Sequence, residues 1–285
     1  FVLSSAADED DRFSPIVGTE VKIPVLVQTS AAETWLNALL LEQEKQSFVK
    51  IYAWDGSAYD IYFQGIALQG MSVNEDTYFP YQVEIRATDG LGRLKDKLYN
   101  VDNETPYSGD SQVRTVLNKI LLKADLADLF GTSDIFLQIG IDIKHDDQLS
   151  GDTFNRVRVY EGAFYSVDAN FNYQWMNSYE VLEQILRRFG ARIFMLNGRY
   201  IVASVNRFRQ TTAQGFYSYT KGNAAIGQNS VDLLIENIKY KKLAASVYNN
   251  YPPLNHVAVR YNYKMSQYAG SLIPPSAPYI FSIRG

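Results

Sequence analysis

The chain has 285 residues and a formal net charge of -4 at pH 7, with 27 Lys and Arg against 31 Asp and Glu. This balance argues against a surface that binds duplex DNA, because neutralising phosphates requires clustered basic residues. The absence of Cys excludes disulfides, thiolate catalysis and Cys-built zinc sites. No apolar run reaches the length of a membrane span, so we expect no stable membrane insertion. The length fits one large or two ordinary domains, and we expect two.

Residues 1–100 predict a β-rich unit with one helix. Residues 20–27 alternate apolar and polar side chains as a strand does, and Pro24 within them indicates a sheet edge. Ser30 and Glu33 have the spacing of a capping box and predict the start of a helix. The apolar face expected for that helix is Trp35, Leu36, Leu39 and Leu40. Strands over residues 48–54 and 59–63 follow, separated by an Asp-Gly turn.

A further strand over residues 81–87 runs into Thr88, Asp89, Gly90, Leu91 and Gly92. A Gly-x-Gly after a strand also occurs in nucleotide-binding loops. Here the third glycine and the Gly-Lys-Ser/Thr of a phosphate loop are missing, and no apolar helix with βαβ spacing follows. We therefore interpret the segment as a turn with positive φ at Gly90 and Gly92, and we predict no bound cofactor.

The middle of the chain predicts a linker and a helix. Residues 100–110 are rich in turn formers, and the helix after residue 111 has an apolar face made of Val113, Val116, Leu117, Ile120 and Leu121. His145 lies beside Asp142, Asp146 and Asp147 in a polar stretch, which is more typical of a solvated loop than of a metal site. We find no catalytic motif and predict no catalytic residue and no metal, although scattered carboxylates that converge in a glycosidase site stay an open alternative.

Residues 177–206 repeat the order of helix, strand, turn and strand seen at residues 30–63. Asn177 is placed to cap a helix together with Glu180, and Asn197-Gly198 is typical of a two-residue hairpin turn. The apolar stripe of the predicted helix consists of Val181, Leu182, Ile185, Leu186 and Phe189. The repeated order predicts two related domains.

Residues 210–227 are rich in Gly, Thr and Ser with interleaved aromatic residues, and we predict a long surface loop there. Phe216, Tyr217 and Tyr219 in this loop form a candidate contact site. Local packing of the same aromatic rings is the alternative. Pro24 at the predicted sheet edge is the other candidate contact residue.

The patterns together predict an α+β, predominantly β protein with two related domains, each with a capped helix followed by a hairpin. The boundaries that we expect are residues 1–100 for the first domain, 101–150 for a helical connector and 151–285 for the second domain. The apolar start at Phe1 and the strand-like run before Gly285 lead us to expect a piece of a longer or processed polypeptide.

Four segments, covering residues 14–20, 81–96, 179–205 and 251–253, resemble phage and prophage tail proteins of the baseplate-hub or tail-tip-hub type. The most recognisable of them contains Thr88, Asp89, Gly90, Leu91 and Gly92. None is a catalytic signature, so the specificity of the resemblance lies in the combination and order of the four.

The resemblance implies two β-barrel-like hub domains in each chain and three chains in a ring of pseudo-sixfold character. Such a homotrimer is expected in the virion tail, after assembly in the host cytoplasm, where it joins the tail tube or distal tail protein to a central spike or fibre. The tape measure protein is a further expected partner, and DNA is expected only in transit through the channel. The resemblance implies no enzyme activity.

Two other functions stay open at this point. The first is a receptor- or carbohydrate-binding tail module, favoured by the aromatic content and the predicted loop at residues 216–219. The second is a tail-associated glycan hydrolase, which needs a cleft with two carboxylates. If the hub interpretation holds, exposed aromatic residues and the edge near Pro24 are expected at subunit contacts.

Overall fold

The structure is a computed structural model that describes residues 2–5, 14–41, 47–54, 57–68, 78–102, 104–141, 152–209, 214–231, 233, 258–259 and 281–282. The chain forms two compact units, residues 1–240 and residues 241–285. The feature described in the second unit is an antiparallel pair of β15 (Ala258–Val259) and β16 (Phe281–Ser282). All other elements belong to the first unit.

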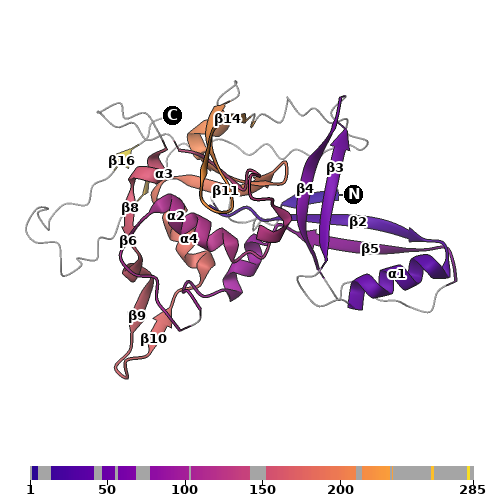
Figure 1. The fold of residues 1–285 in the computed structure, drawn as a ribbon, viewed down its shortest axis with the longest axis horizontal. Coiled ribbons are helices and arrows are strands. Elements are labelled where there is room, and N and C mark those ends of the chain that lie inside the picture. The colour runs from indigo at the N-terminus through magenta and orange to yellow at the C-terminus, as the bar shows by residue number, and fades with distance from the viewer. Residues whose placement is uncertain are drawn as a thin grey trace, which may run out of the picture. The chain divides into compact units, whose positions relative to one another are not determined.

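The first five-stranded sheet contains β1 (Val2–Ser5), β2 (Thr19–Val27), β5 (Tyr81–Thr88), β4 (Tyr59–Leu68) and β3 (Phe48–Trp54), in that spatial order. All its neighbouring strands are antiparallel. β4 pairs with β5 only over its last three residues, Ile66 to Leu68, whereas β3 and β4 pair along their length. The β3–β4 hairpin therefore projects beyond β5 and stands across β2 and β5 in Figure 1.

The second five-stranded sheet contains β11 (Ala191–Leu196), β12 (Arg199–Ser204), β7 (Leu137–Gly140), β13 (Gln214–Tyr219) and β14 (Ala225–Val231), in that order. The pairing of β12 with β7 is parallel and the other pairings are antiparallel. The prediction of a surface loop at residues 210–227 is therefore wrong. Its described residues form β13, which lies inside the sheet, and β14 at the sheet edge.

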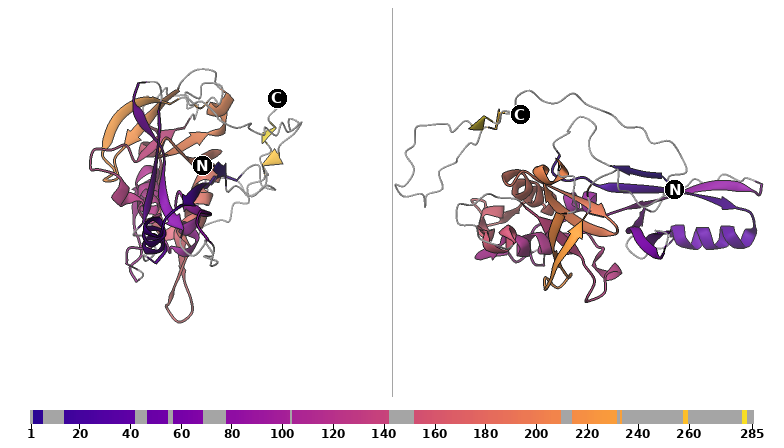
Figure 2. Two further views of the ribbon diagram at one scale, coloured as in Figure 1. Left: turned by 90° about the vertical axis from the view of Figure 1, so that its right-hand side faces the viewer. Right: turned by 90° about the horizontal axis from the view of Figure 1, so that it is seen from above.

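Helices and short strands complete the first unit. The helices are α1 (Ser30–Leu41), α2 (Val113–Leu122), α3 (Thr153–Arg156) and α4 (Ser178–Arg188), and the 3-10 turns are η1 (Leu91–Asp96), η2 (Ala127–Leu129), η3 (Glu161–Phe164) and η4 (Val205–Arg209). β6 (Asp110–Gln112) pairs with β8 (Arg158–Tyr160), and β9 (Tyr165–Val167) with β10 (Tyr173–Trp175). The β9–β10 hairpin extends away from α2 and α4 (Figures 1 and 2).

The predicted start of α4 and the hairpin that follows are confirmed. Asn177 Oδ1 accepts a hydrogen bond from the Glu180 amide at 2.7 Å, which satisfies one of the free donors of the first helical turn. The turn residues Asn197 and Gly198 have φ values of 49° and 67°. Two positive φ values give the twist that matches a two-residue hairpin.

The prediction for α1 is correct in position and wrong in two details. The cap is Thr29, whose Oγ1 accepts from the Ala32 amide at 3.3 Å, and Ser30 is already helical. Trp35 was expected on the apolar face and is 58% exposed, whereas Leu36 is fully buried. The buried cluster around Leu36 consists of Val27, Val83 and Ile85, all from β2 and β5.

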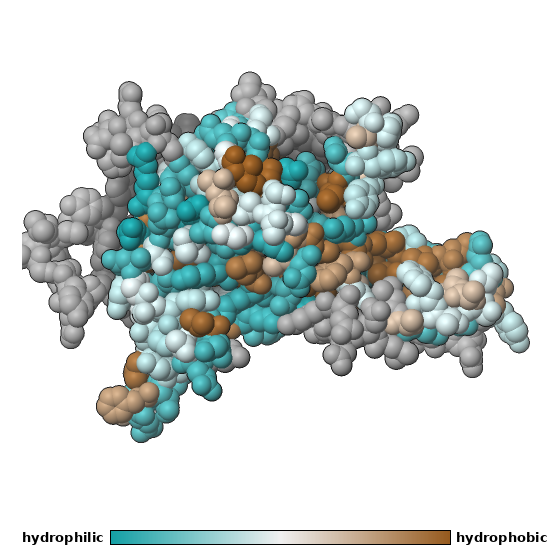
Figure 3. Space-filling model, viewed as in Figure 1, coloured by the Kyte–Doolittle hydropathy of each residue, from teal (hydrophilic) through white to brown (hydrophobic). Residues whose placement is uncertain are grey.

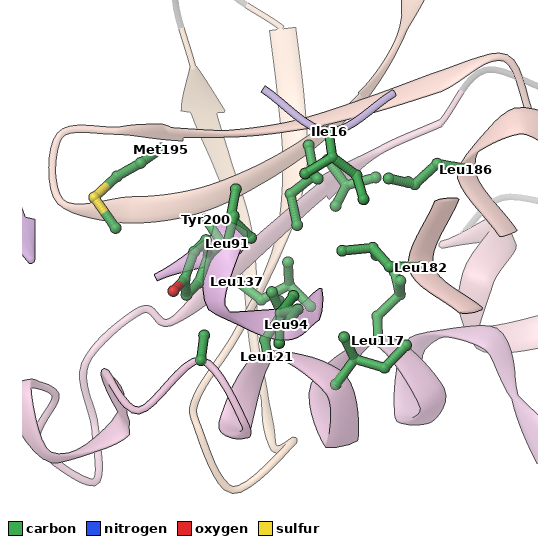
Figure 4. Close-up of a cluster of buried hydrophobic side chains, with 14 of the residues drawn as sticks. Ile16, Leu91, Leu94, Leu117, Leu121, Leu137, Leu182, Leu186, Met195 and Tyr200 are labelled. Atoms are coloured by element: carbon green, nitrogen blue, oxygen red, sulfur yellow. The ribbon is translucent and has the colours of Figure 1, made fainter. Parts of the chain in front are cut away.

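One large hydrophobic core contains residues of α2, α4, η1 and the second sheet together with residues of β2, β4 and β5 in the first sheet. Ile16, Leu94, Leu117, Leu182 and Tyr200 contribute from five separate elements or segments (Figure 4). The helix face predicted after residue 111 is confirmed, because Val113, Val116, Leu117, Ile120 and Leu121 are all buried. Burial of this extent is the main stabilising contribution to the first unit.

The segment before β2 covers the outer edge of β11. The Val17 amide donates to the Ile193 carbonyl at 2.9 Å, and the Ile193 amide donates to the Pro15 carbonyl at 2.8 Å. Ile16 forms a parallel bridge with Ile193 and is 3% exposed. The segment between β1 and β2 of the first sheet is thus tied to the second sheet.

The fold is α+β with more strand than helix, as predicted. The expected boundaries at residues 100 and 150 both fall inside the first unit. The predicted linker also contacts the core, since Tyr107 packs on Tyr99 with ring centroids 4.8 Å apart. The β-barrel-like form expected for two separate hub domains stays a prediction.

Candidate functional sites

Asp89 of the recognisable motif is buried where the two sheets meet. Its carboxylate accepts hydrogen bonds from the Thr19 amide at 2.6 Å and the Leu91 amide at 3.0 Å. Its backbone carbonyl accepts from the Tyr200 hydroxyl at 2.7 Å. Burial raises the pKa of Asp89 to about 7, although the bonds from Leu91 and Thr19 pull it down. Asp89 therefore connects β2, η1 and β12 and has no exposed surface.

The glycines of the same motif serve the turn in different ways. Gly90 has a φ of 77°, as predicted, and a Cβ there would lie 2.5 Å from the Ala124 carbonyl oxygen. Gly92 lies within η1 and lacks the positive φ that was expected. Thr88 ends β5 and Leu91 is fully buried. The motif thus builds a tight joint, and its geometry accounts for the residue types without a nucleotide.

Glu161 is the centre of a buried polar network between α2 and η3. Its carboxylate accepts from Tyr99 Oη at 2.6 Å, from Lys119 Nζ at 2.7 Å and from the Ser111 hydroxyl. Lys119 also lies 4.2 Å from the centre of the Tyr107 ring. Burial, and then the hydrogen bond to Glu161 and the charge of that carboxylate, raise the pKa of Tyr99. Because each oxygen of Glu161 is hydrogen-bonded within the protein, we interpret the network as structural.

A second buried carboxylate, Asp152, holds β13 against α3. Asp152 accepts from the Phe154 amide at 2.9 Å, which caps α3, and from the Tyr219 hydroxyl at 2.5 Å. Arg114 lies over the Tyr219 ring, 4.5 Å from its centre. Burial raises the pKa of Asp152 against the effects of Tyr219, Phe154 and Arg114. This group also has its partners inside the protein.

A cleft of about 590 Å³ lies between the projecting β3–β4 hairpin, residues 129–135 and the β11–β12 turn. We call it the hairpin cleft. Its lining consists of Lys50, Tyr52, Tyr59, Asp60, Ile61, Gln64, Leu129, Phe130, Asp134, Ile135, Asn197, Gly198 and Arg199. The volume is within the range of roughly 300–1,000 Å³ that is common for ligand pockets.

The strand register explains why the cleft is aromatic. Tyr52 pairs with Ile61 and Trp54 with Tyr59, so these side chains share one face of the hairpin. Tyr52 is 53% exposed and Tyr59 is 72% exposed. Trp54 lies beside Tyr59 with ring centroids 5.0 Å apart. The hairpin therefore presents aromatic surface to the solvent at the mouth of the cleft.

Hydrogen bonds connect the β3–β4 wall of the hairpin cleft with its other two walls, the β11–β12 turn and residues 129–135. Gln64 Nε2 donates to the Gly198 carbonyl at 2.6 Å, and Lys50 Nζ donates to the Leu129 carbonyl at 3.2 Å. Gly198 approaches so closely that a Cβ there would lie 2.5 Å from Ile61 Cγ2. Asp134 accepts from the Gly131 amide at 2.7 Å and fixes the third wall. The cleft is thus built by contacts between distant parts of the chain.

The candidate contact residues differ in how much of their surface is exposed. β2 is not an edge strand, because it lies between β1 and β5, but Pro24 is exposed and lies beyond the described β1–β2 pairing, which ends at Lys22. Phe216 is fully buried and Tyr219 is 3% exposed, because β13 is an inner strand. Tyr217 is half-buried. A contact role stays a prediction, and only Pro24 and Tyr217 retain surface for it.

Several sequence predictions lie outside the described residues. They are the Asp-Gly turn at 55–56, His145 with its neighbouring carboxylates, and the Pro-Pro segment at 251–253. In the part of the chain that the structure describes, no group of three or more His, Asp or Glu is placed to hold a metal ion. No helix among the described residues is long and apolar enough to cross a membrane.

Sequence reasoning missed the hairpin cleft although part of its signal is present. Lys50, Tyr52 and Trp54 alternate along β3 and so share one face. Aromatic residues on a strand usually indicate a half-buried surface, so the pattern did not reveal that this face is open. The opposite wall comes from residues 129–135 and 197–199, and no local pattern connects these segments with β3.

No protein-family model matches this chain, and no curated protein matches it. Among solved structures, it is similar to the 43 kDa tail protein of prophage MuSo2 from Shewanella oneidensis, with 11% sequence identity and a TM-score of 0.32. The match covers 67% of this chain and 47% of that chain, so this chain spans about half the length of that protein. At this level of similarity the match carries no functional assignment.

Proposed function

We propose that this chain is a structural protein of a phage tail tip, of the hub type. Three copies form a ring that joins the tail tube or distal tail protein to a central spike or fibre, next to the tape measure protein, and the ring surrounds the path of the DNA. The proposal starts from the four sequence segments that resemble tail hub proteins. It includes no reaction.

The repeated helix–hairpin unit is the observation that carries this proposal. α1 leads to the β3–β4 hairpin and α4 leads to the β11–β12 hairpin. In each case the first hairpin strand lies at the edge of a five-stranded sheet and the second pairs inward. Three copies of a chain with two such units present six similar units, which suits a partner of sixfold symmetry.

Exposed apolar surface supports an assembled state. Hydrophobic residues gather over β2 and β5 (Figure 3), where Ile23 and Val25 are half-buried on the face that packs against Leu36 of α1. Leu26 points to the opposite face of β2 and is 54% exposed. Trp35 on α1 is 58% exposed. Large apolar side chains exposed in this way are common on surfaces that bind other proteins. In the proposed ring, subunit contacts cover it.

The three buried carboxylates have structural roles, which leaves Asp60 and Asp134 of the hairpin cleft as the carboxylates that a ligand in the cleft would meet. Asp89, Asp152 and Glu161 accept hydrogen bonds from other groups of this chain and help to hold its elements together. Catalytic carboxylates need a position that contacts a substrate. These three groups are at most 6% exposed and do not line the hairpin cleft.

The solution mass of the purified chain over a range of concentrations tests the ring. We expect a species near 97 kDa, three times the 32.3 kDa of one chain, at high concentration. Replacing the exposed Leu26 by Asp is expected to shift this species towards the monomer, whereas Val101→Asp is the matched control on an equally exposed aliphatic residue. A monomer at every concentration counts against the ring.

A further inference from the structure

We propose that the hairpin cleft binds a neutral carbohydrate. The proposal goes beyond the hub function and does not depend on it, because the lining residues all come from one chain. It also moves the candidate glycan site away from residues 216–219, which form a buried strand, to the face shared by β3 and β4.

The aromatic wall provides the apolar part of such a site. Tyr52 and Tyr59 line the cleft and expose 53% and 72% of their surface, and Trp54 extends this wall beside Tyr59. One face of a pyranose ring is made of C–H groups, which pack on the flat face of an aromatic ring. Large aromatic side chains give much contact area at a low cost in side-chain entropy.

The polar lining matches hydroxyl groups better than it matches an anion. Lys50 and Arg199 contribute two positive charges, and Asp60 and Asp134 contribute two negative charges. Their formal charges cancel, so the cleft does not select a phosphate or a strongly acidic ligand. The same side chains supply both donors and acceptors, and a sugar hydroxyl uses one of each.

A buried amide at the floor adds an independent observation. Gln64 lines the cleft and is 3% exposed. Its Nε2 donates to the Gly198 carbonyl, while its Oε1 has no hydrogen-bond partner among the described residues. A buried acceptor without a donor is unfavourable by about 1–3 kcal/mol. The oxygen is covered in the free chain, so a ligand hydroxyl supplies this donor only after a small shift of the side chains around it.

The site is largely preformed, which lowers the entropy cost of binding. The contacts of Gln64 with Gly198 and of Lys50 with Leu129 span 134 and 79 residues of sequence and fix the two walls. Asn197 and Gly198 occupy a hairpin turn with defined φ values. Binding energy is then not spent on ordering these walls.

Saturation-transfer NMR on the full chain with maltotriose, cellotriose and chitotriose tests the proposal. We expect transfer to at least one of the three trisaccharides. Tyr59→Ala and Tyr52→Ala are each expected to weaken that binding about tenfold, because each removes an aromatic contact surface. Asp60→Asn is expected to weaken it less and to leave the thermal midpoint unchanged, since Asp60 is exposed.

Matched controls distinguish binding in the cleft from non-specific binding to exposed aromatic side chains. Trp35→Ala and Phe171→Ala remove exposed aromatic side chains that do not line the cleft, and they are expected to bind the sugar as the natural chain does. Absence of transfer to all three trisaccharides overturns the proposal. Equal losses in the controls overturn it too.

Two further outcomes would change the assignment of the cleft. Inorganic phosphate that displaces the sugar, with loss of phosphate binding in Arg199→Gln, shows an anion site and overturns the choice of a neutral ligand. Shortened sugars in the mass spectrum after incubation leave the carbohydrate site in place and overturn the proposed lack of a reaction. The solution mass is measured separately, so failure of the ring and failure of the cleft are distinguishable.

Discussion

The two helix–hairpin units of this chain share an order of elements and differ in what surrounds them. α4 packs on β11, α2 and η1, and Val181, Leu182, Ile185 and Leu186 on its inner face are buried. The buried Leu36 of α1 packs instead on β2 and β5. The hairpin that follows α1 exposes Tyr52, Trp54 and Tyr59.

The outer edges of the two hairpins differ as well, because one is covered by another segment of the chain and the other is open among the described residues. The outer edge of β11 is covered by Pro15 to Val17, whereas β3 is the last strand of its sheet among the described residues. The β11–β12 hairpin therefore forms part of the core, whereas the β3–β4 hairpin leaves one face and one edge exposed among the described residues. Repetition of a local pattern predicts the elements, while the neighbours on each face decide whether a unit stabilises the protein or binds something.

The largest contrast is expected from core truncation. Leu182→Ala on α4 leaves a cavity in the main core and is expected to lower the free energy of unfolding by about 2–5 kcal/mol. Trp35→Ala on α1 is expected to change it by less than about 0.5 kcal/mol, because exposed side chains contribute little to folding. Urea unfolding of both variants measures the difference, and equal losses contradict the comparison.

Asp89, which is buried where the two five-stranded sheets meet, is expected to make the free energy of unfolding depend on pH. Burial raises its pKa from 3.8 to about 7 in the folded state. Between those values the unfolded chain has lost the proton while the folded chain keeps it, so the free energy of unfolding falls as pH rises from about 4 to about 7, by about 4 kcal/mol at most. The burial of Asp152 raises its pKa too and adds a fall of the same sign.

Asp89→Asn tests this assignment because an amide does not ionise. The variant is expected to be less stable by about 1–3 kcal/mol at pH 4, since an amide accepts only one of the two backbone bonds. Its stability is expected to fall less between pH 4 and 7 than that of the natural chain. Unfolding curves at four pH values measure both effects, and identical slopes rule out Asp89 as the titrating group.

Gly198→Ala is expected to separate the two hairpins. The new Cβ meets Ile61 of β4 and is added at a φ of 67°, so we expect a loss of about 1–3 kcal/mol in unfolding free energy. Gly222→Ala is the control, because that turn glycine has no atom within 3.4 Å of the added Cβ and no positive φ. A thermal midpoint for Gly198→Ala equal to that of the control refutes the close contact.

The smallest contrast concerns the two helix caps. Asn177→Ala removes an acceptor 2.7 Å from the Glu180 amide and is expected to cost about 1 kcal/mol. Thr29→Ala removes a longer, exposed bond of 3.3 Å and is expected to cost about 0.5 kcal/mol or less. Thermal unfolding followed by circular dichroism measures both, and a larger loss for Thr29 reverses the order that the structure predicts.

Local chemistry in the sequence determined the parts of this protein that depend on neighbours along the chain. Asn177 caps α4 because its side chain reaches an amide three residues ahead, and Asn197-Gly198 forms a hairpin turn because both residues tolerate positive φ. The bounds of β3 and the buried face of α2 follow from side-chain periodicity in the same way.

Tertiary structure alone decided which surfaces are buried and where a ligand site forms. Phe216 lies in a segment with loop-like composition, yet it is buried because Gly140 on β7 leaves room for its ring: a Cβ at Gly140 would lie 2.5 Å from it. The hairpin cleft likewise needs β3, β4, residues 129–135 and the β11–β12 turn together. These contacts join residues far apart in sequence, and their free energy depends on packing that no local pattern encodes.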